Sequence, residues 1–260
     1  MVKVRISSEY QSDKRIKVFV ESIPDIFDNE GAILYQERNI VKIFSIPTSD
    51  KDPKLVVIKR YKRLHVVQRL IYTYFRLSKA MRAFNNSIEL RKRGIDTPHG
   101  IACLEQFRNG ILEYGYYISC FTGDSPIGNV LEENLGFDKS VADAFAYFVA
   151  TLHEKGILHH DLNSTNVLYS FLEDKYSFSI IDINRMRFSQ KGKELDRKTC
   201  FDNLTRFTGK MDLYEYVVSH YIKYRGWSEN LLSEAIHVKI EHDKAWRRRK
   251  DFLKWLHPFF

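Results

Sequence analysis

Two side chains with oxygen atoms, five positions apart, lie in the segment of residues 157–169. Asp161 and Asn166 occupy a polar stretch between the apolar pairs 157–158 and 167–168. In a loop of this length, a carboxylate can face a hydroxyl group and accept its proton. The amide oxygen a few ångströms away can bind a divalent cation that is held on phosphate groups. The spacing therefore indicates transfer of a phosphoryl group to a hydroxyl.

A second metal ligand and a phosphate-binding cation are expected at the ends of two other apolar segments. Asp182 follows the apolar run 178–181, and Lys59 follows the run 55–58. Lys59 is predicted to anchor the phosphates of ATP. Glu89 is the only acidic residue between Lys59 and Arg93, so it is the predicted ion-pair partner of Lys59. The alternatives are an ordinary lysine at a strand end and a glutamate that pairs within its own helix.

Taken together, these residues match the pattern of kinase active sites. Asp161 is the predicted base, Asn166 and Asp182 are the predicted metal ligands, and ATP with Mg²⁺ or Mn²⁺ are the predicted cofactors. His159 is predicted to pack behind the metal-binding strand, and a role as catalytic base is the alternative. His160 and Arg185 are candidate contacts to the acceptor, although His160 also fits a space-filling role in the loop.

The elements that position these residues differ between the two halves of the chain. Short apolar runs predict strands that form an antiparallel meander, at 17–20, 32–35, 40–44 and 55–58. Apolar residues at helical spacing predict one long helix over 65–93, which stops at Gly94. Strands at 100–107 and 111–120 follow, joined by a tight turn at Asn109-Gly110. After residue 124 a helix capped by Asp138 ends at Gly156, and the tail from Cys200 is mostly helical.

This order predicts an α+β, bilobal protein-kinase-like fold. The N-terminal lobe is an antiparallel β-sheet with one main helix, and the C-terminal lobe is mostly helical. We expect a single catalytic domain over residues 1–260, with an N-lobe at 1–120, a hinge at 121–124 and a C-lobe at 125–260.

The chain resembles a known family, the lipopolysaccharide kinases of the Kdo kinase and WaaP type. The resemblance extends from about residue 30 to about residue 225. It rests on the segments VIKR (57–60), RLSKA (76–80), GIDTP (94–98), LHEKGILHHDL (152–162) and IDINRM (181–186).

The resemblance implies phosphorylation of a sugar hydroxyl, of Kdo or a heptose, in the inner core of lipopolysaccharide. It implies an inner-core or lipid A precursor as acceptor, and a location at the cytoplasmic face of the inner membrane. The family roles fall on Lys59 as phosphate anchor, Glu89 as its partner, Asp161 as base, and Asn166 with Asp182 as metal ligands.

Several departures from the protein-kinase pattern bear on the acceptor. Gly31 stands alone where a glycine-rich loop is expected, His160 replaces an arginine, and Asn163 replaces a lysine. No proline lies between Pro126 and Pro258, so the segment that anchors a peptide-binding platform is missing. A small-molecule or glycan acceptor is therefore favoured over a protein. A protein kinase, another small-molecule kinase and a non-catalytic pseudokinase-like binding protein remain the alternatives.

The net charge of +8 is concentrated in one segment. Eleven Lys or Arg residues and one acid lie between Lys59 and Arg93. This segment fits contact with an anionic partner, such as a phosphorylated glycan or an anionic membrane, and it equally fits a solvated helix face. No nucleic-acid motif accompanies the charge, so we expect no nucleic-acid partner. The C-terminal run 246–260 mixes cations with aromatic residues, which fits either a membrane-surface helix or packing on the C-lobe.

The remaining composition indicates an intracellular protein. Cys103, Cys120 and Cys200 lack the CxxC spacing of zinc sites and are odd in number, so we expect neither a zinc site nor a disulfide framework. No apolar run approaches the roughly 18 residues of a membrane span. The opening residues 1–17 lack the apolar region of a secretion signal, and we therefore expect a cytoplasmic location.

Overall fold

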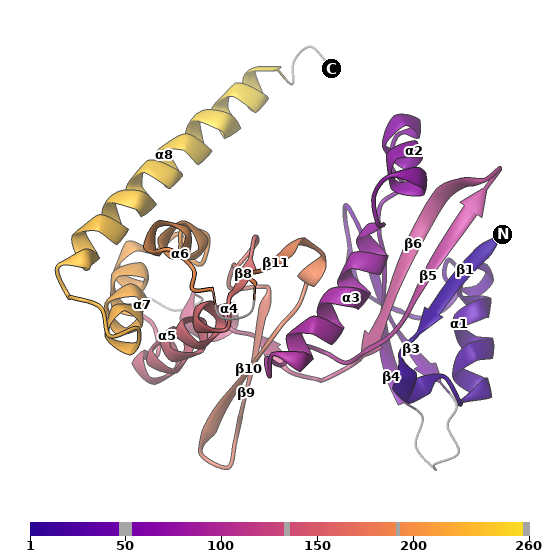
Figure 1. Cartoon of the computed structure of the whole chain (residues 1–260), viewed down its shortest axis with the longest axis horizontal. Coiled ribbons are helices and arrows are strands. Elements are labelled where there is room, and N and C mark those ends of the chain that lie inside the picture. The colour runs from indigo at the N-terminus through magenta and orange to yellow at the C-terminus, as the bar shows by residue number, and fades with distance from the viewer. Residues whose placement is uncertain (47–53, 133–135, 191–192, 257–260) are drawn as a thin grey trace. The chain divides into compact units, whose positions relative to one another are not determined.

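The computed structural model describes residues 1–46, 54–132, 136–190 and 193–256 (Figure 1). Its internal contacts divide the chain into two units. The first unit is Met1–Gly123 with Ile181–Arg185, and the second is Asp124–Ile180 with Met186–Phe260. The expected lobe boundaries and the expected single catalytic domain stay predictions.

The first unit is built on a six-stranded antiparallel sheet in the order β1-β5-β6-β4-β3-β2. Its strands are β1 (Val2–Ile6), β2 (Ala32–Gln36), β3 (Ile40–Ile46), β4 (Lys54–Arg60), β5 (Gly100–Arg108) and β6 (Ile111–Cys120). The predicted meander over β2, β3 and β4 and the β5–β6 hairpin are confirmed. The hairpin turns at Asn109 and Gly110, whose φ angles of 51° and 76° are both left-handed, as a tight two-residue turn requires.

Helices cover the two faces of this sheet (Figure 1). On one face lies α1 (Lys14–Ile26), and on the other lies α3 (Lys79–Lys92). The helix α1 buries one stripe against the strands, and its members are Ile16, Val20 and Ile23, followed by Phe27. The short helix α2 (Val66–Tyr74) contacts β6, and η1 (Ser8–Tyr10) and η2 (Ile183–Arg185) are single 3₁₀ turns.

The predicted strand at residues 17–20 is wrong, because this segment lies inside α1. Asp13 caps the helix by accepting a hydrogen bond from the Arg15 backbone N–H at 2.9 Å. The buried residues Ile16, Val20 and Ile23 recur at helical spacing, whereas Lys17 and Val18 are exposed. A segment with only three consecutive apolar residues, 18–20, fits both the strand and the helix period, and only the longer buried stripe distinguishes them.

The predicted single helix over 65–93 is also wrong, because the structure has two helices there. The helix α2 ends at Tyr74, and Ser78 begins α3 by accepting a hydrogen bond from the Met81 backbone N–H at 3.1 Å. A serine side chain at this position satisfies one of the free N–H groups of a helix start. The apolar pattern therefore continues across a break that the Ser78 cap creates.

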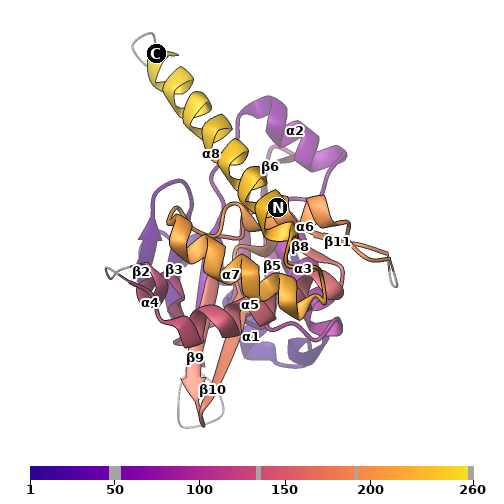
Figure 2. The ribbon, with the colours of Figure 1, turned by 90° about the vertical axis from the view of Figure 1, so that its left-hand side faces the viewer.

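The second unit is mostly helical. Its helices are α4 (Gly128–Leu131), α5 (Lys139–Glu154), α6 (Arg197–Leu204), α7 (Met211–Tyr224) and α8 (Leu231–Leu256). Figure 2 shows α5 and α7 side by side, and they are in contact. The predicted cap is confirmed, because Asp138 accepts hydrogen bonds from the N–H groups of Ser140 and Val141. The helical tail is confirmed as well.

Two small sheets complete the second unit. The strands β7 (Ser125–Pro126), β9 (Val167–Leu172) and β10 (Lys175–Ile180) form one, and β8 (Ile157–His159) pairs with β11 (Met186–Phe188) in the other. The strand β8 pairs antiparallel with β11, β9 pairs antiparallel with β10, and the polar loop connects β8 to β9. No helix in the described part of the chain has the length and apolar character that a membrane span requires.

Candidate functional site

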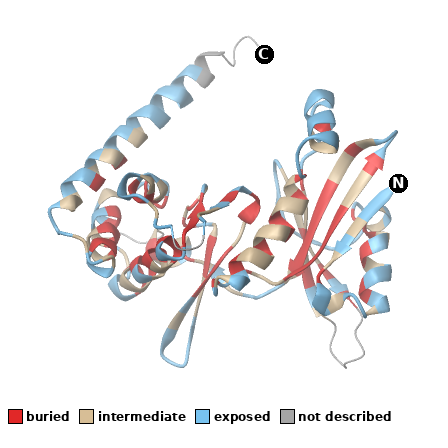
Figure 3. Cartoon of the chain, viewed as in Figure 1, coloured by how far each residue is buried: buried red, intermediate tan, exposed pale blue. Residues whose placement is uncertain are grey.

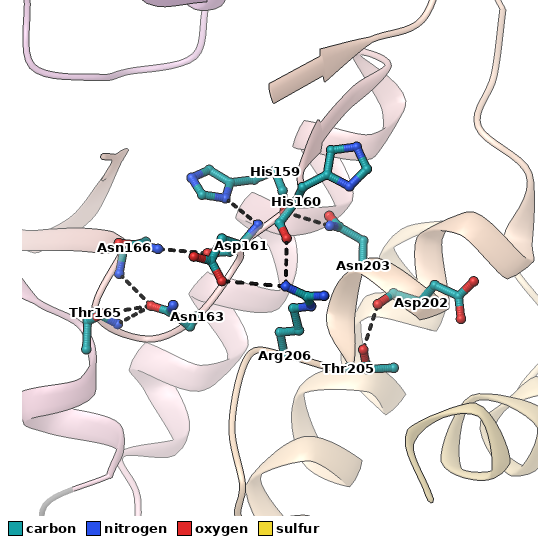
Figure 4. Close-up of polar contacts among 10 residues, drawn as sticks. All are labelled: His159, His160, Asp161, Asn163, Thr165, Asn166, Asp202, Asn203, Thr205 and Arg206. Atoms are coloured by element: carbon teal, nitrogen blue, oxygen red, sulfur yellow. Dashed lines mark hydrogen bonds and ion pairs between the residues drawn. The ribbon is translucent and has the colours of Figure 1, made fainter. Parts of the chain in front are cut away.

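The loop between β8 and β9 holds Asp161 and Asn166 through its own hydrogen bonds (Figure 4). The Asn163 side-chain oxygen accepts hydrogen bonds from the N–H groups of Thr165 and Asn166, both at 3.0 Å. The Asn166 Nδ2 donates to the Asp161 backbone oxygen at 2.8 Å. Because that bond uses the amide nitrogen, the Asn166 Oδ1 is the atom suited to bind a cation. Asn163, where protein kinases have a lysine, shapes this loop.

A buried histidine is hydrogen-bonded to the backbone of this loop. His159 is 1% exposed, and its Nδ1 accepts a hydrogen bond from the Asp161 backbone N–H at 3.1 Å. The Asn203 Nδ2, from α6, donates to the His159 backbone oxygen at 2.7 Å. These contacts agree with the predicted packing role of His159.

Asn203 extends this support into the helical core. Its Oδ1 lies 3.0 Å from the His153 Nε2, and the His153 Nδ1 lies 2.9 Å from the Tyr221 hydroxyl. Burial lowers the pKa of His153 to about 4, so the imidazole is neutral at pH 7. The Asn203 oxygen then accepts from Nε2–H, and Nδ1 accepts from the tyrosine. The chain of hydrogen bonds joins the Asp161 backbone to α5, α6 and α7, and no motif in the sequence pointed to it.

Arg206 lies beside the Asp161 carboxylate. Its guanidinium NH1 is 3.8 Å from the Asp161 Oδ1 and donates to the His160 backbone oxygen at 3.2 Å (Figure 4). No motif in the sequence points to Arg206, which comes 45 positions after Asp161. In the same view, the exposed His160 ring is turned away from the Asp161 carboxylate. Arg206 therefore supplies the cation next to the predicted base.

The first unit contains the other predicted metal ligand and the phosphate anchor. The Lys59 Nζ lies 2.7 Å from the Asp182 Oδ1, and the Asn184 Nδ2 donates to the same oxygen at 2.6 Å. The φ angle of Asp182 is 54°, a left-handed conformation that costs a residue other than glycine about 1–3 kcal/mol. Residues held by their contacts in a strained backbone conformation, as Asp182 is, occur often at functional sites.

Helix α3 contacts the segment after Asp182 through Asn86 and not through Glu89. The Asn86 Nδ2 donates to the Ile183 backbone oxygen at 2.7 Å. Glu89 instead pairs with Arg93, one turn further along the helix, at 2.8 Å. The predicted Lys59–Glu89 ion pair is therefore wrong for this structure, because each residue has a closer partner of opposite charge. Any role of Glu89 with bound nucleotide stays a prediction.

Several charged side chains of the first unit act on Lys79. Burial is the main cause that lowers the pKa of Lys79, and nearby positive charges lower it further. Those charges are Arg38, Arg185 and Arg82, and Asp182 acts in the opposite direction. Cations that repel one another in this way are stabilised by an added anion, and phosphate groups are such anions. Of the four cations Lys79, Arg38, Arg185 and Arg82, only Arg185 was a predicted site residue.

The residues available for a metal are oxygen donors. Among the residues that the structure describes, no three His, Cys, Asp or Glu side chains gather as a metal site. The Asn166 amide oxygen and the Asp182 carboxylate are nevertheless the hard ligands that Mg²⁺ prefers, and Mg²⁺ completes its coordination with water and substrate phosphates. Each of these two side chains, Asn166 in the second unit and Asp182 in the first, therefore has the donor chemistry that suits a divalent cation.

Comparison with known proteins finds similarity in sequence to one family and in fold to a solved structure. Residues 135–224 match the model of the family described as "Lipopolysaccharide kinase (Kdo/WaaP) family". A solved structure titled "WaaP in complex with acyl carrier protein" is similar over 95% of this chain and 97% of that one, with a TM-score of 0.56 and 11% sequence identity. No curated protein matches. The structural similarity confirms the predicted α+β, protein-kinase-like fold. The family match includes Asp161, Asn166 and Asp182.

Proposed function

We propose that the chain is an ATP-dependent kinase of the lipopolysaccharide kinase (Kdo/WaaP) family and that it phosphorylates a sugar hydroxyl of Kdo or of a heptose in the inner core. The observation that carries this proposal is the loop in which Asn166 binds the Asp161 backbone oxygen, inside the matched range 135–224. That hydrogen bond leaves a carboxylate and an amide oxygen for acceptor and cation.

In the proposed reaction, Asp161 accepts the proton of the sugar hydroxyl while the hydroxyl oxygen bonds to the γ-phosphorus of ATP. The bond from that phosphorus to the β–γ bridging oxygen breaks, and ADP leaves. Lys59 would bind the phosphates of ATP, and Asn166 and Asp182 would hold the divalent cation, which would neutralise charge on those phosphates. Lys79, Arg38 and Arg82 contribute further positive charge near Asp182.

The proposed acceptor also implies where the enzyme acts. Inner-core sugars are linked to lipid A, so the acceptor is anchored in a membrane. We therefore propose that the enzyme works at the cytoplasmic face of the inner membrane as a peripheral protein. The cationic segment between Lys59 and Arg93 supports this proposal.

The test is transfer to purified inner-core acceptors. The protein is incubated with ATP and Mg²⁺ and with deacylated oligosaccharides that end in Kdo or in a heptose. We expect one acceptor to gain the mass of one phosphate group, and linkage analysis then identifies the hydroxyl. The Asp161→Asn variant is the control and should give almost no product. ATP binding without transfer to any glycan would support the pseudokinase alternative, and transfer to a protein would support the protein-kinase alternative.

A further inference from the structure

Helix α2 (Val66–Tyr74) turns its apolar side chains outward. In Figure 3 most of this helix is exposed. The exposed apolar residues of α2 and the segment after it are Val66, Val67, Leu70, Ile71, Tyr74, Phe75 and Leu77. Val67 is 69% exposed and Phe75 is 85% exposed. Clustered exposed apolar residues mark a contact surface, whereas single ones need no explanation.

The polar side of α2 faces the sheet. Arg69 is 9% exposed, and its Nε donates to the Leu112 backbone oxygen at 2.6 Å. Thr73 accepts a hydrogen bond from the Leu112 backbone N–H at 2.9 Å and donates to the Arg69 backbone oxygen at 2.7 Å. These bonds attach the helix to β6 through its polar residues. These contacts thus hold the apolar face of α2 toward the outside. An ordinary surface helix turns its apolar face toward the core.

The surroundings of the apolar face are cationic. No Asp or Glu lies between Asp52 and Glu89 in the sequence. The exposed residues Lys62 and Arg63 precede α2, and the exposed Arg76 follows it. Arg63 pairs with Glu113 at 3.0 Å, but Lys62 and Arg76 still give the surface a net positive charge around the exposed apolar side chains. A partner that offers both apolar contact and negative charge would match it.

We propose that α2 docks this enzyme on an anionic lipid bilayer, with its apolar side chains among the acyl chains and the flanking cations on lipid phosphates. A short helix that ends at Tyr74 and is followed by Phe75 suits the headgroup boundary, where aromatic rings are favoured. This proposal rests on the proposed function in one respect: docking would bring the enzyme to an acceptor that is anchored in the membrane. The cationic segment between Lys59 and Arg93 supports only attraction to a negatively charged membrane, whereas this proposal assigns the apolar contact with the membrane to α2.

The test compares two variants matched in residue types and exposure. Val67→Ser/Ile71→Ser removes apolar side chains that are 69% and 43% exposed on α2. Val18→Ser/Ile33→Ser removes the same types, 67% and 58% exposed, from α1 and β2. Co-sedimentation is measured with phosphatidylcholine vesicles and with vesicles that also contain phosphatidylglycerol. No ATP or acceptor is added, so the result does not depend on the kinase reaction.

We expect the unchanged protein to bind the anionic vesicles more strongly than the neutral ones. Val67→Ser/Ile71→Ser should lose at least about tenfold in affinity, while the matched variant should stay within about twofold. If the α2 variant does not fold, as judged by circular dichroism, Lys62→Gln/Arg76→Gln replaces it and should lose the preference for anionic vesicles.

Three results would overturn the proposal. The first is equal vesicle binding by the unchanged protein and the α2 variant. The second is a dimer in sedimentation that only the α2 variant loses, since α2 would then contact a second copy. The third is binding of an acidic acyl carrier protein, lost in the α2 variant, without any vesicle binding. Transfer to a deacylated acceptor should be unaffected in the α2 variant, and loss of that transfer in the unchanged protein would contradict the proposed function alone.

Discussion

At the scale of single residues, the site combines a base and a cation that come from different parts of the second unit. Asp161 is positioned by the loop, and Arg206 reaches its carboxylate from the segment after α6. A guanidinium beside a base can bind an anionic group of the acceptor, such as a sugar carboxylate or a phosphate. Arg206 is therefore a candidate for acceptor recognition in addition to the predicted residues.

Asp161→Asn should lower turnover by about 100-fold or more with little change in ATP binding, because the amide cannot accept the proton of the acceptor. Phosphate transfer is measured by mass spectrometry, and ATP binding by calorimetry. Turnover close to that of the unchanged enzyme would remove Asp161 from the role of base.

Arg206→Gln should raise KM for the glycan acceptor by about tenfold while the KM for ATP changes little, because a charge-assisted hydrogen bond contributes about 1.5 kcal/mol. Arg206→Lys, which keeps the charge, should restore part of the loss. A fall in kcat with an unchanged acceptor KM would instead assign Arg206 to the support of Asp161.

Lys59→Met should weaken ATP binding, because Lys59 is the predicted phosphate anchor. Glu89→Gln should change ATP binding by less than about twofold, since the Glu89 partner in the structure is Arg93 and exposed pairs within a helix contribute only about 0.5 kcal/mol. Both variants are compared by nucleotide titration. A strong loss in Glu89→Gln would mean that bound nucleotide brings Glu89 to Lys59.

At the scale of elements, the loop depends on helices that lie behind it. Asn203 of α6 and His153 of α5 connect the His159 backbone to Tyr221 of α7. A protonated His153 would lose the hydrogen bond that its Nδ1 accepts and would put a charge in the core. The network therefore requires neutral His153, which gives the stability of the second unit a pH dependence.

The sign of this dependence follows from the lowered pKa. His153 has a pKa of about 4 in the folded protein, against 6.5 as the ordinary value. Its contribution to stability is complete above pH 6.5 and is lost as the pH falls toward 4, by on the order of 3 kcal/mol. We expect thermal unfolding temperatures to decline over this range, and to decline less steeply for His153→Gln. Parallel curves for the two proteins would contradict the role of His153.

At the scale of the whole molecule, cationic and apolar surfaces occur in both units. In the second unit, α8 is attached near its start, where the buried Lys239 donates to the Thr205 backbone oxygen at 2.8 Å. Beyond that point Trp246 and Phe252 are 55% and 58% exposed, and Lys250 lies over the Trp246 ring. The side chains of residues 253–260 lie outside the described part of the chain. The membrane role of the C-terminal run stays a prediction.

Changing Arg247, Arg248 and Arg249 to Gln should weaken binding to anionic vesicles further at low salt than at high salt. The reason is that each cation near such a surface contributes about 1 kcal/mol, which added salt screens. Co-sedimentation over a salt series, alone and combined with Val67→Ser/Ile71→Ser, separates the charge of α8 from the apolar contact of α2. An unchanged salt dependence would mean that the C-terminal cations do not meet lipid.

The features that the sequence determined alone are those set by contacts between near neighbours. The spacing of Asp161 and Asn166 is held by hydrogen bonds inside one loop, the turn at Asn109-Gly110 by two left-handed residues, and the start of α5 by the Asp138 cap. Such features rest on a few consecutive residues, so residue type and spacing predict them.

The tertiary structure decided what depends on residues far apart in the chain. Lys59 meets Asp182, which is 123 residues away, in place of the nearer Glu89, and Arg206 reaches Asp161 from a segment without a motif. The break at Ser78 and the outward apolar face of α2 also came from the structure, because apolar spacing does not say which face meets the sheet. The hydrogen bonds of Arg69 and Thr73 to Leu112 hold the polar face of α2 against the sheet. Which of two possible partners a side chain contacts depends on distances and charges in the folded structure. Residue types and spacing within a short segment do not determine those distances.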